Sequence, residues 1–243
     1  MQGNVLITGA SRGIGRAIAQ RLAQDGWRPL IHYKERRSEA ELVAVETRGV
    51  AAPLGTDLSI PADCQKLWKW AIAEGPVRAL VNNAGLYIAQ AFDIESDDAF
   101  AEAWRASYET NFGSSLRLTR YFLKQARDGD RILNVCSRVG FRGEAGAAHY
   151  AASKAALANL TRSLAIELAP KKIGVFGIAP GWVETAMIRE GMEARKAEII
   201  AGIPLGRVAA PEDCAAAAAF LMSDDASYLS GQIIDVNGAS YFH

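Results

Sequence analysis

Short apolar runs alternate with longer segments of helical periodicity along the whole chain. The apolar runs read NVLIT, RPLIHY, a weaker stretch at 51–55, ALVN, RILNVCS, GVFGIA and GQIIDVNG. The helical segments lie near 14–24, from 38 onward, and near 60–73, 96–126, 148–169 and 211–222. Short strands that are apolar throughout and separated by helices indicate a parallel sheet covered on both faces. We therefore predict an α/β fold, a single doubly wound Rossmann-type domain over residues 1–243 with about seven strands.

Composition narrows the class of protein. Half of the residues are hydrophobic, 22% are charged, and the formal net charge is zero. These values are ordinary for a soluble globular protein and argue against a nucleic-acid binder or a polybasic membrane protein. The three cysteines and three histidines are scattered, so we expect neither a disulfide framework nor a metal site. With no secretory signal and no apolar run long enough to cross a bilayer, a cytoplasmic location is expected.

Candidate catalytic and ligand-binding residues stand directly after the predicted strands. Right-handed crossovers bring the carboxyl ends of parallel strands to one edge of a sheet, where ligands bind. The residues that fall at this edge are Thr8 and Gly9, Tyr33, Asp57, the stretch 82–85, Ser137 and Pro180. We therefore expect one site along this edge.

A glycine-rich turn, TGASRGIG from Thr8 to Gly15, joins the first strand to the first helix. Glycines permit a tight turn and a close approach of the backbone to a ligand. The helix that follows offers free N–H groups and the positive end of its dipole to an anion. In this strand–turn–helix context the turn predicts a binding site for a dinucleotide pyrophosphate.

Tyr150 and Lys154 are four positions apart, so on a helix they share one face. An ammonium beside a phenol favours the phenolate and lowers the phenol pKa from about 10. A tyrosine of that kind exchanges protons near neutral pH, and the hydroxyl of Ser137 is available to hydrogen-bond the same substrate oxygen. The three residues predict chemistry at a carbonyl or an alcohol.

TGASRGIG, NNAG, Ser137, Tyr150-x-x-x-Lys154, PGWVETAM and SGQIIDVNGA appear in an order and spacing that resembles the short-chain dehydrogenase/reductase family over essentially the whole chain. Within that family the 3-oxoacyl-[acyl-carrier-protein] reductases are the nearest in character. The resemblance implies four catalytic residues. Tyr150 would protonate the carbonyl, Ser137 would hydrogen-bond its oxygen, Lys154 would lower the Tyr150 pKa and hold the nicotinamide ribose, and Asn111 would hold a relay water.

The resemblance also implies a nicotinamide cofactor. Tyr33 stands at the end of the second strand, where an aspartate commonly selects NAD, and Lys34 and Arg12 are cations that suit the 2′-phosphate of NADP(H). Glu35 is close enough in sequence to reach a ribose, and complicates this choice. The residues assigned to the cofactor are Gly9, Ser11, Arg12, Gly13, Ile14, Gly15, Tyr33, Lys34, Asp57, Leu58, Asn83, Ala84, Gly85, Tyr150, Lys154, Pro180, Gly181, Val183 and Thr185.

The substrate side is less defined. By resemblance, residues 185–207 form a lid over the substrate, Trp182 lines the pocket, and the loop from Arg138 to His149 helps to select the substrate. Arg142 in that loop pairs either with an anionic substrate group or with Glu144, and the sequence leaves both open. Lys171 and Lys172 are expected near the entrance, as docking of a carrier protein would require. The acids Asp128 and Asp130 argue against such docking.

The resulting prediction is an NADP(H)-dependent oxidoreductase that transfers a hydride between nicotinamide and a carbonyl or secondary alcohol. Within that class, the reduction of 3-oxoacyl thioesters is the first candidate reaction. The alternatives are a reductase of a small cyclic, sugar-like or anionic ketone, and a non-catalytic NADP(H)-sensing regulator on the same fold. By resemblance the protein forms a homotetramer or homodimer. Neither nucleic acid nor a membrane is an expected partner.

Overall fold

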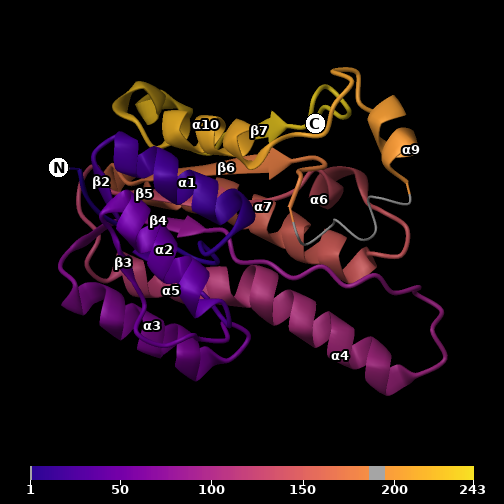
Figure 1. Ribbon diagram of the computed structural model, residues 1–243, viewed down its shortest axis with the longest axis horizontal. Helices are drawn as coiled ribbons and strands as arrows, with labels where there is room; N and C mark the ends of the chain where they lie inside the picture. The colour runs from indigo at the N-terminus through magenta and orange to yellow at the C-terminus, as the bar shows by residue number, and fades with distance from the viewer. Residues whose placement is uncertain (1, 186–194) are drawn as a thin grey trace.

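A computed structural model describes residues 2–185 and 195–243. Seven strands form one parallel sheet in the order β3-β2-β1-β4-β5-β6-β7 (Figure 1). The strands are β1 (Gly3–Ile7), β2 (Trp27–Ile31), β3 (Val50–Ala51), β4 (Val77–Asn82), β5 (Arg131–Val135), β6 (Gly174–Pro180) and β7 (Ile233–Val236). The α/β class, the doubly wound topology and the strand number predicted from the apolar runs are confirmed.

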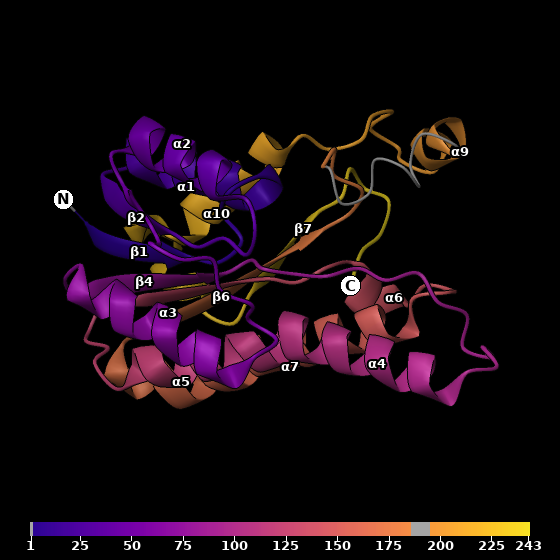
Figure 2. The same ribbon diagram turned by 60° about the horizontal axis from the view of Figure 1, so that its bottom comes forward.

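Helices cover both faces of the sheet. The helices are α1 (Gly13–Gln24), α2 (Arg37–Thr47), α3 (Pro61–Ala73), α4 (Asp97–Tyr108), α5 (Ser114–Leu123), α6 (Val139–Arg142), α7 (Ala148–Leu168), α9 (Lys196–Ala201) and α10 (Pro211–Leu221). Shorter helical turns are η1 (Glu109–Gly113), η2 (Ala169–Lys171) and η3 (Asp224–Leu229). Figure 2 shows α1, α2 and α10 on one face, and α3, α5, α7 and α4 on the other.

The central strands are buried on both faces, which explains why their sequences are apolar without alternation. Leu6 and Ile7 of β1 and Leu80 of β4 have no exposed surface. Burying one such side chain stabilises the fold by about 1.5–3 kcal/mol. The core therefore fixes the sheet and, with it, the positions of the loops at its carboxyl edge.

The strand order reverses beside β1, because β2 pairs on one side of it and β4 on the other. Ile7 is in register with Ile31 of β2 and with Val81 of β4. The loops that follow these three strands therefore begin side by side. A reversal of this kind leaves a crevice at the carboxyl edge of the sheet, the usual ligand site in open α/β folds.

Two features depart from the sequence-based expectations. The helix expected over 96–126 is interrupted by η1, a π-helical turn between α4 and α5. The short helix α6 was not expected. Residues 186–194 of the expected lid lie outside the described residues, and the part that follows them contains α9. Within the described part of the chain, no helix has both the length and the apolar character needed to cross a membrane.

Candidate active site

The glycine-rich turn after β1 has the geometry that its sequence predicts. Gly9 and Gly13 adopt positive φ angles of 62° and 55°, which side chains disfavour. A Cβ atom on Gly15 would lie 2.4 Å from the Asn83 side-chain nitrogen and 2.5 Å from the Gly9 carbonyl oxygen. Glycine is therefore required here by both conformation and space.

The turn delivers the amino end of α1 to the carboxyl edge of the sheet. Arg12, the residue that caps α1, is extended, and its side chain makes no capping hydrogen bond. Thr185 lies against the same turn, with its methyl carbon 3.2 Å from where a Cβ atom on Gly13 would be. A cradle lined by glycine, at the start of a helix whose first N–H groups lack a side-chain cap, fits the pyrophosphate of a dinucleotide.

Asn83 and Thr8 tie the loop after β4 to this turn. The Asn83 side-chain amide donates to the carbonyl oxygens of Thr8 at 2.8 Å and Gly9 at 3.1 Å. The Thr8 hydroxyl accepts from the backbone N–H groups of Asn83 and Ala84, each at 2.9 Å. The NNAG motif thus holds the dinucleotide turn in place.

His32 is a site residue that sequence reasoning missed. Its Nδ1 accepts from the Gly9 N–H at 2.9 Å, and its Nε2 lies 3.0 Å from the Thr56 carbonyl oxygen. An imidazole with the proton on Nε2 satisfies both contacts. Burial lowers the pKa of His32 to about 4, against a weaker opposing effect of the Thr56 hydrogen bond, so the ring is neutral at physiological pH. The available signal was its position directly after β2, beside the glycine turn.

Lys34 and Asp57, both expected at the cofactor, form an ion pair with a separation of 2.8 Å. Partial burial alone would raise the Asp57 pKa, but hydrogen bonds from Lys34 and Ser59 more than offset it and hold the pKa below its usual value. The hydrogen bond to Asp57 raises the pKa of Lys34. Arg12 is exposed on the preceding turn. The two cations therefore follow the neighbouring strands β1 and β2 at the carboxyl edge of the sheet, and the charge of Lys34 is partly neutralised by Asp57.

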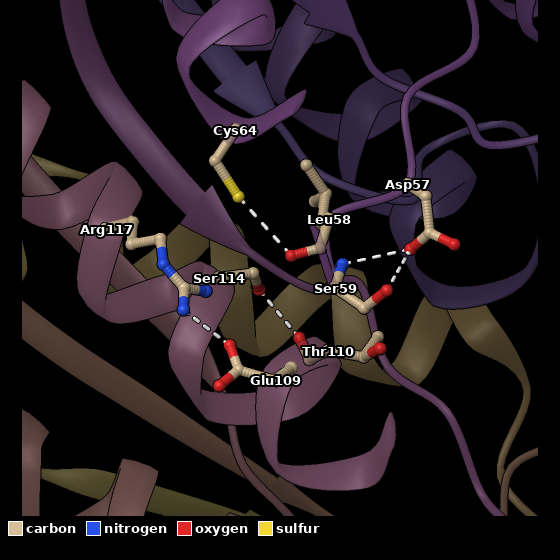
Figure 3. A network of polar contacts seen from close by, with 8 residues as sticks. All are labelled: Asp57, Leu58, Ser59, Cys64, Glu109, Thr110, Ser114 and Arg117. Atoms are coloured by element: carbon tan, nitrogen blue, oxygen red, sulfur yellow. Dashed lines mark hydrogen bonds and ion pairs between the residues drawn. The ribbon is translucent and has the colours of Figure 1, made fainter. Parts of the chain in front are cut away.

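The loop after β3 packs closely on the interior. Figure 3 shows the Asp57 carboxylate accepting from the backbone and hydroxyl of Ser59, and the Cys64 thiol donating to the Leu58 carbonyl oxygen. The Leu58 side chain is buried in the main core, and Tyr33 is buried with it. Both residues stand at the predicted edge as structural supports of the crevice.

Asn111 lies on η1 and is completely buried. Its side-chain oxygen accepts from the Leu86 N–H at 2.7 Å, and its amide donates to the Leu86 carbonyl oxygen and the Ser153 hydroxyl, each at 3.0 Å. Ser153 in turn donates to the Tyr150 carbonyl oxygen at 2.7 Å. The π-turn therefore aims Asn111 inward and links it to the start of the helix that carries Tyr150.

An ion pair braces this π-turn. Arg117 of α5 lies 2.5 Å from a carboxylate oxygen of Glu109, as Figure 3 shows, and Ser114 donates to the Thr110 carbonyl oxygen. A Cβ atom on Gly113 would lie 2.7 Å from Glu109 and 3.0 Å from Arg117. Glycine at this position leaves room for the ion pair, and π-turns of this kind are frequent at functional sites.

The Ser137 hydroxyl lies close enough to the Tyr150 phenol to influence its pKa. Burial raises the pKa of Tyr150 to about 12, and the Ser137 hydroxyl only partly opposes this effect. The ring of Tyr87 packs edge-on against Tyr150, with centroids 5.2 Å apart. The phenol is therefore protonated across neutral pH and is held ready to donate.

Lys154 lies beside Tyr150, but burial raises the Tyr150 pKa, so the lowered pKa that the sequence predicts is not found in this structure. The ammonium donates to the Val135 carbonyl oxygen at 2.8 Å and stands 5.8 Å from the centre of the Tyr150 ring. Burial lowers the pKa of Lys154 itself to about 8. The ammonium is also near Asn111, since a Cβ atom on Gly85 would lie 3.6 Å from Lys154 and 3.4 Å from the Asn111 side-chain oxygen.

The loop between Ser137 and Tyr150 forms α6 and a turn that follows it. Arg142 is exposed and faces Glu144 at 3.5 Å, which is the internal pairing that the sequence had left open. Phe141 stacks on His243 with ring centroids 3.7 Å apart. His149 is buried. The loop is therefore packed against the C-terminal segment.

The segment after β6 runs from the reacting residues to the dinucleotide turn. Pro180 ends β6, and Gly181 packs on Asn237, since a Cβ atom there would lie 2.8 Å from that side chain. Val183 is buried and bridges to Ala209. Trp182 and Val208 pack against a small cluster formed by Ile199 and Ile203. The residues expected around the nicotinamide thus share one wall.

Lys171 and Lys172 are not near the entrance. They precede β6, and Lys172 pairs with Asp128, which precedes β5, at 3.1 Å. Both loops lie at the amino edge of the sheet, whereas Ser137 and Pro180 lie at the opposite edge. The two lysines stand directly before β6 and therefore lie at its amino end, which is why this expectation was wrong. The described site offers no argument for carrier-protein docking at these lysines.

Comparisons with known proteins agree with this geometry. The family model described as enoyl-(acyl carrier protein) reductase matches residues 9–239. The 3-oxoacyl-[acyl-carrier-protein] reductase of Salmonella typhimurium is 38% identical over 240 residues, which cover 97% of this chain and 96% of that protein. The enzyme of the same name from Pseudomonas aeruginosa is 38% identical over 252 residues, with coverage of 99% and 98%.

Solved structures share the fold over the whole chain. A short-chain dehydrogenase/reductase, glucose/ribitol dehydrogenase, from Brucella melitensis is 32% identical with a TM-score of 0.91, covering 100% of this chain and 98% of that one. A short-chain dehydrogenase from Burkholderia cenocepacia, crystallised in complex with NADP, is 28% identical with a TM-score of 0.91 and coverage of 99% and 98%.

Proposed function

The chain belongs to the short-chain dehydrogenase/reductase family of oxidoreductases, and from this premise we propose that it reduces a carbonyl group, or oxidises the corresponding secondary alcohol, with NADP(H) as hydride carrier. The observation that carries the proposal is the pair of neighbouring hydroxyls of Ser137 and Tyr150. They lie at the carboxyl edge of the sheet that also holds the dinucleotide turn. One edge thus combines a proton donor with a place for the hydride carrier.

Tyr150 is the proton donor in this proposal. Its raised pKa keeps the phenol protonated at neutral pH, as a general acid requires. The Ser137 hydroxyl hydrogen-bonds the substrate oxygen and stabilises the negative charge that develops there. Tyr150 donates its proton to that oxygen in reduction and recovers it from the alcohol in oxidation.

Lys154 and Asn111 support the donor. Lys154 is positioned by the Val135 carbonyl oxygen, with its charge available to the nicotinamide ribose. Asn111 holds a relay water in the proposed scheme, and its bond to Ser153 fixes the start of α7.

NADP(H) is favoured over NAD(H) by the charges at the end of β2. The uncharged Tyr33 follows β2 at the position where an aspartate would repel the 2′-phosphate of NADP(H). The cations Arg12 and Lys34 are close to this position in the glycine-rich turn and directly after Tyr33. The neighbour from Burkholderia cenocepacia, which was crystallised with NADP, supports the same choice.

The substrate class has two candidates. The relatives named 3-oxoacyl-[acyl-carrier-protein] reductases support a 3-oxoacyl thioester. A buried arginine next to Ser137, described below, favours a small anionic ketone instead. By family resemblance we propose a homodimer or homotetramer, which light scattering after gel filtration tests.

The test of the proposed function is the Tyr150→Phe variant. Purified protein is assayed for NADPH oxidation with a panel of acyl thioesters, sugars, cyclic ketones and oxo acids. The variant is expected to lose turnover by about 100-fold or more while NADPH binding survives. Tyr121→Phe on α5 is the matched control. Retained turnover in Tyr150→Phe refutes the assignment of the donor, and NADPH binding without turnover of any substrate by the wild type indicates a sensing regulator.

A further inference from the structure

Arg138 directly follows Ser137 and is only 5% exposed. Its backbone N–H donates to the Pro180 carbonyl oxygen at 3.1 Å, which continues the pairing of β5 with β6. Its guanidinium lies 5.9 Å from the centre of the Trp182 ring, and its Nη1 donates to the Ser240 hydroxyl at 2.5 Å. The side chain is therefore held between the wall formed by Trp182 and the segment that follows β7.

Arg138 has no carboxylate partner among residues 2–185 and 195–243. Arg131, at the start of the preceding strand β5, shows the usual arrangement, because it is 7% exposed and pairs with Asp224 at 2.8 Å. The nearby carboxylate of Glu144 is directed to Arg142. Burial, with some help from the Arg142 charge, lowers the pKa of Arg138, and the Glu144 charge opposes this effect only in part. A buried cation that forms no ion pair is costly, so its presence at a site calls for an anion.

The position of Arg138 next to Ser137 indicates that the substrate would carry this anion. Arg138 is the residue directly after Ser137, and its guanidinium lies beside the Trp182 ring. A guanidinium presents five N–H donors, of which the Ser240 hydroxyl uses one. The donors that are left form a planar fork that matches a carboxylate, and contact with an aromatic ring holds that plane in place.

We propose that Arg138 is an anion-binding subsite and that the preferred substrate is a small oxo acid, with its carboxylate on Arg138 and its ketone on Ser137 and Tyr150. This rests on the proposed function. The ketone carbon gains the hydride and its oxygen gains the Tyr150 proton, so the ketone becomes a secondary alcohol as NADPH is oxidised. The carboxylate keeps its charge and all its atoms. Nothing in this scheme requires a carrier protein.

The experiment compares acids with their own esters. Kinetics of the full-length enzyme with NADPH are measured for 3-oxobutanoate, 4-oxopentanoate and 5-oxohexanoate and for their methyl esters. The expected result is a preference of about 10-fold or more in kcat/KM for at least one acid. In Arg138→Met this acid-to-ester ratio is expected to fall by about 10- to 100-fold, mainly through the KM of the acid, and Arg138→Lys is expected to be intermediate.

Two control variants separate this role from packing. Arg142→Met removes an exposed arginine four residues away and is expected to keep the acid-to-ester ratio. Ser240→Ala removes the hydrogen bond to Arg138 while leaving the guanidinium, and it is also expected to keep a preference for the acid. Thermal unfolding reports whether Arg138→Met is folded. A wild type without preference, or a ratio unchanged in folded Arg138→Met, overturns the proposal, as does loss of the ratio in Arg142→Met alone.

Failure of the proposed function is visible separately. If the esters and thioesters are reduced without any preference for acids, the proposed reductase function is supported and the anion-binding subsite at Arg138 is refuted. If no compound is reduced, calorimetric titration of the enzyme with NADP+ and 4-oxopentanoate decides the subsite. Binding that is lost in Arg138→Met supports it, whereas binding that is absent in the wild type, or equal in both proteins, overturns it.

Discussion

The imidazole Nδ1 of His32 accepts a hydrogen bond from the backbone N–H of Gly9 at 2.9 Å. A histidine accepts only when that nitrogen carries no proton, so the dinucleotide turn depends on a neutral ring. The opposite nitrogen contacts the Thr56 carbonyl oxygen and fixes the ring between the two loops.

This contact predicts a loss of stability in acid. The native pKa of His32 is about 4 and the value in the unfolded chain is about 6.5, so only the unfolded state takes up the proton between these values. Stability attributable to His32 is therefore complete above pH 6.5 and falls as the pH drops toward 4, by up to about 3 kcal/mol. Urea unfolding between pH 4 and 7 measures this.

His32→Gln provides the comparison, because glutamine does not titrate in this range. The pH dependence of its unfolding free energy between 6.5 and 4 is expected to be shallower than that of the wild type. Parallel curves for the two proteins would assign the acid sensitivity to other groups.

Lys154 predicts an alkaline limit on use of the cofactor. Burial lowers its pKa to about 8, whereas Tyr150 titrates only near 12. The kcat/KM for NADPH at saturating carbonyl substrate reports ionisations of the enzyme before NADPH binds. It is expected to decline above pH 8, because neutral Lys154 offers no charge to the ribose. A profile that is flat to pH 10 contradicts the assignment.

Arg12 and Lys34 predict the choice of cofactor. The double variant Arg12→Ala/Lys34→Ala is expected to lower the ratio of NADPH to NADH affinity by about 10- to 100-fold, because only NADPH has the 2′-phosphate. Fluorescence titration with each cofactor measures the two affinities. Arg36→Ala is the matched control, since this arginine is exposed and pairs with Glu39. Equal losses of affinity for NADPH and NADH would refute the assignment of Arg12 and Lys34 to the 2′-phosphate.

Gly113 predicts the importance of the π-turn. In Gly113→Ala the new methyl group would press on the ion pair of Glu109 and Arg117, at 2.7 Å and 3.0 Å. The displaced turn carries Asn111, so kcat is expected to fall by about 10-fold or more, with a loss of stability of about 1–3 kcal/mol. Steady-state kinetics and thermal unfolding are measured together. Ala106→Gly on α4 is a control for helix propensity, and an equal effect on kcat there would exclude a specific role for the turn.

The sequence predicted the sheet and the edge at which the site lies. Short apolar runs that alternate with helical segments are hard to arrange in any way other than as buried parallel strands. Ser137, Tyr150 and the glycine turn meet where strand ends are expected to meet. Asn111 was placed within one long helix, because no residue pattern marks where hydrogen bonds change from the α to the π spacing. The Tyr150 pKa depends on burial and on the exact place of the Lys154 ammonium, which an i, i+4 spacing does not determine.

The hydrogen bonds that join the loop after β4 to the glycine-rich turn have a consequence for how the substrate of such an enzyme can change. Asn83, Thr8 and His32 secure the cofactor side through β1, β2 and β4, whereas Arg138 and Trp182 extend from β5 and β6. If Arg138 binds the substrate as proposed, we expect substitutions in the second set to alter the choice of substrate without disturbing the first set. New substrates are therefore best sought by varying the residues that follow β5 and β6.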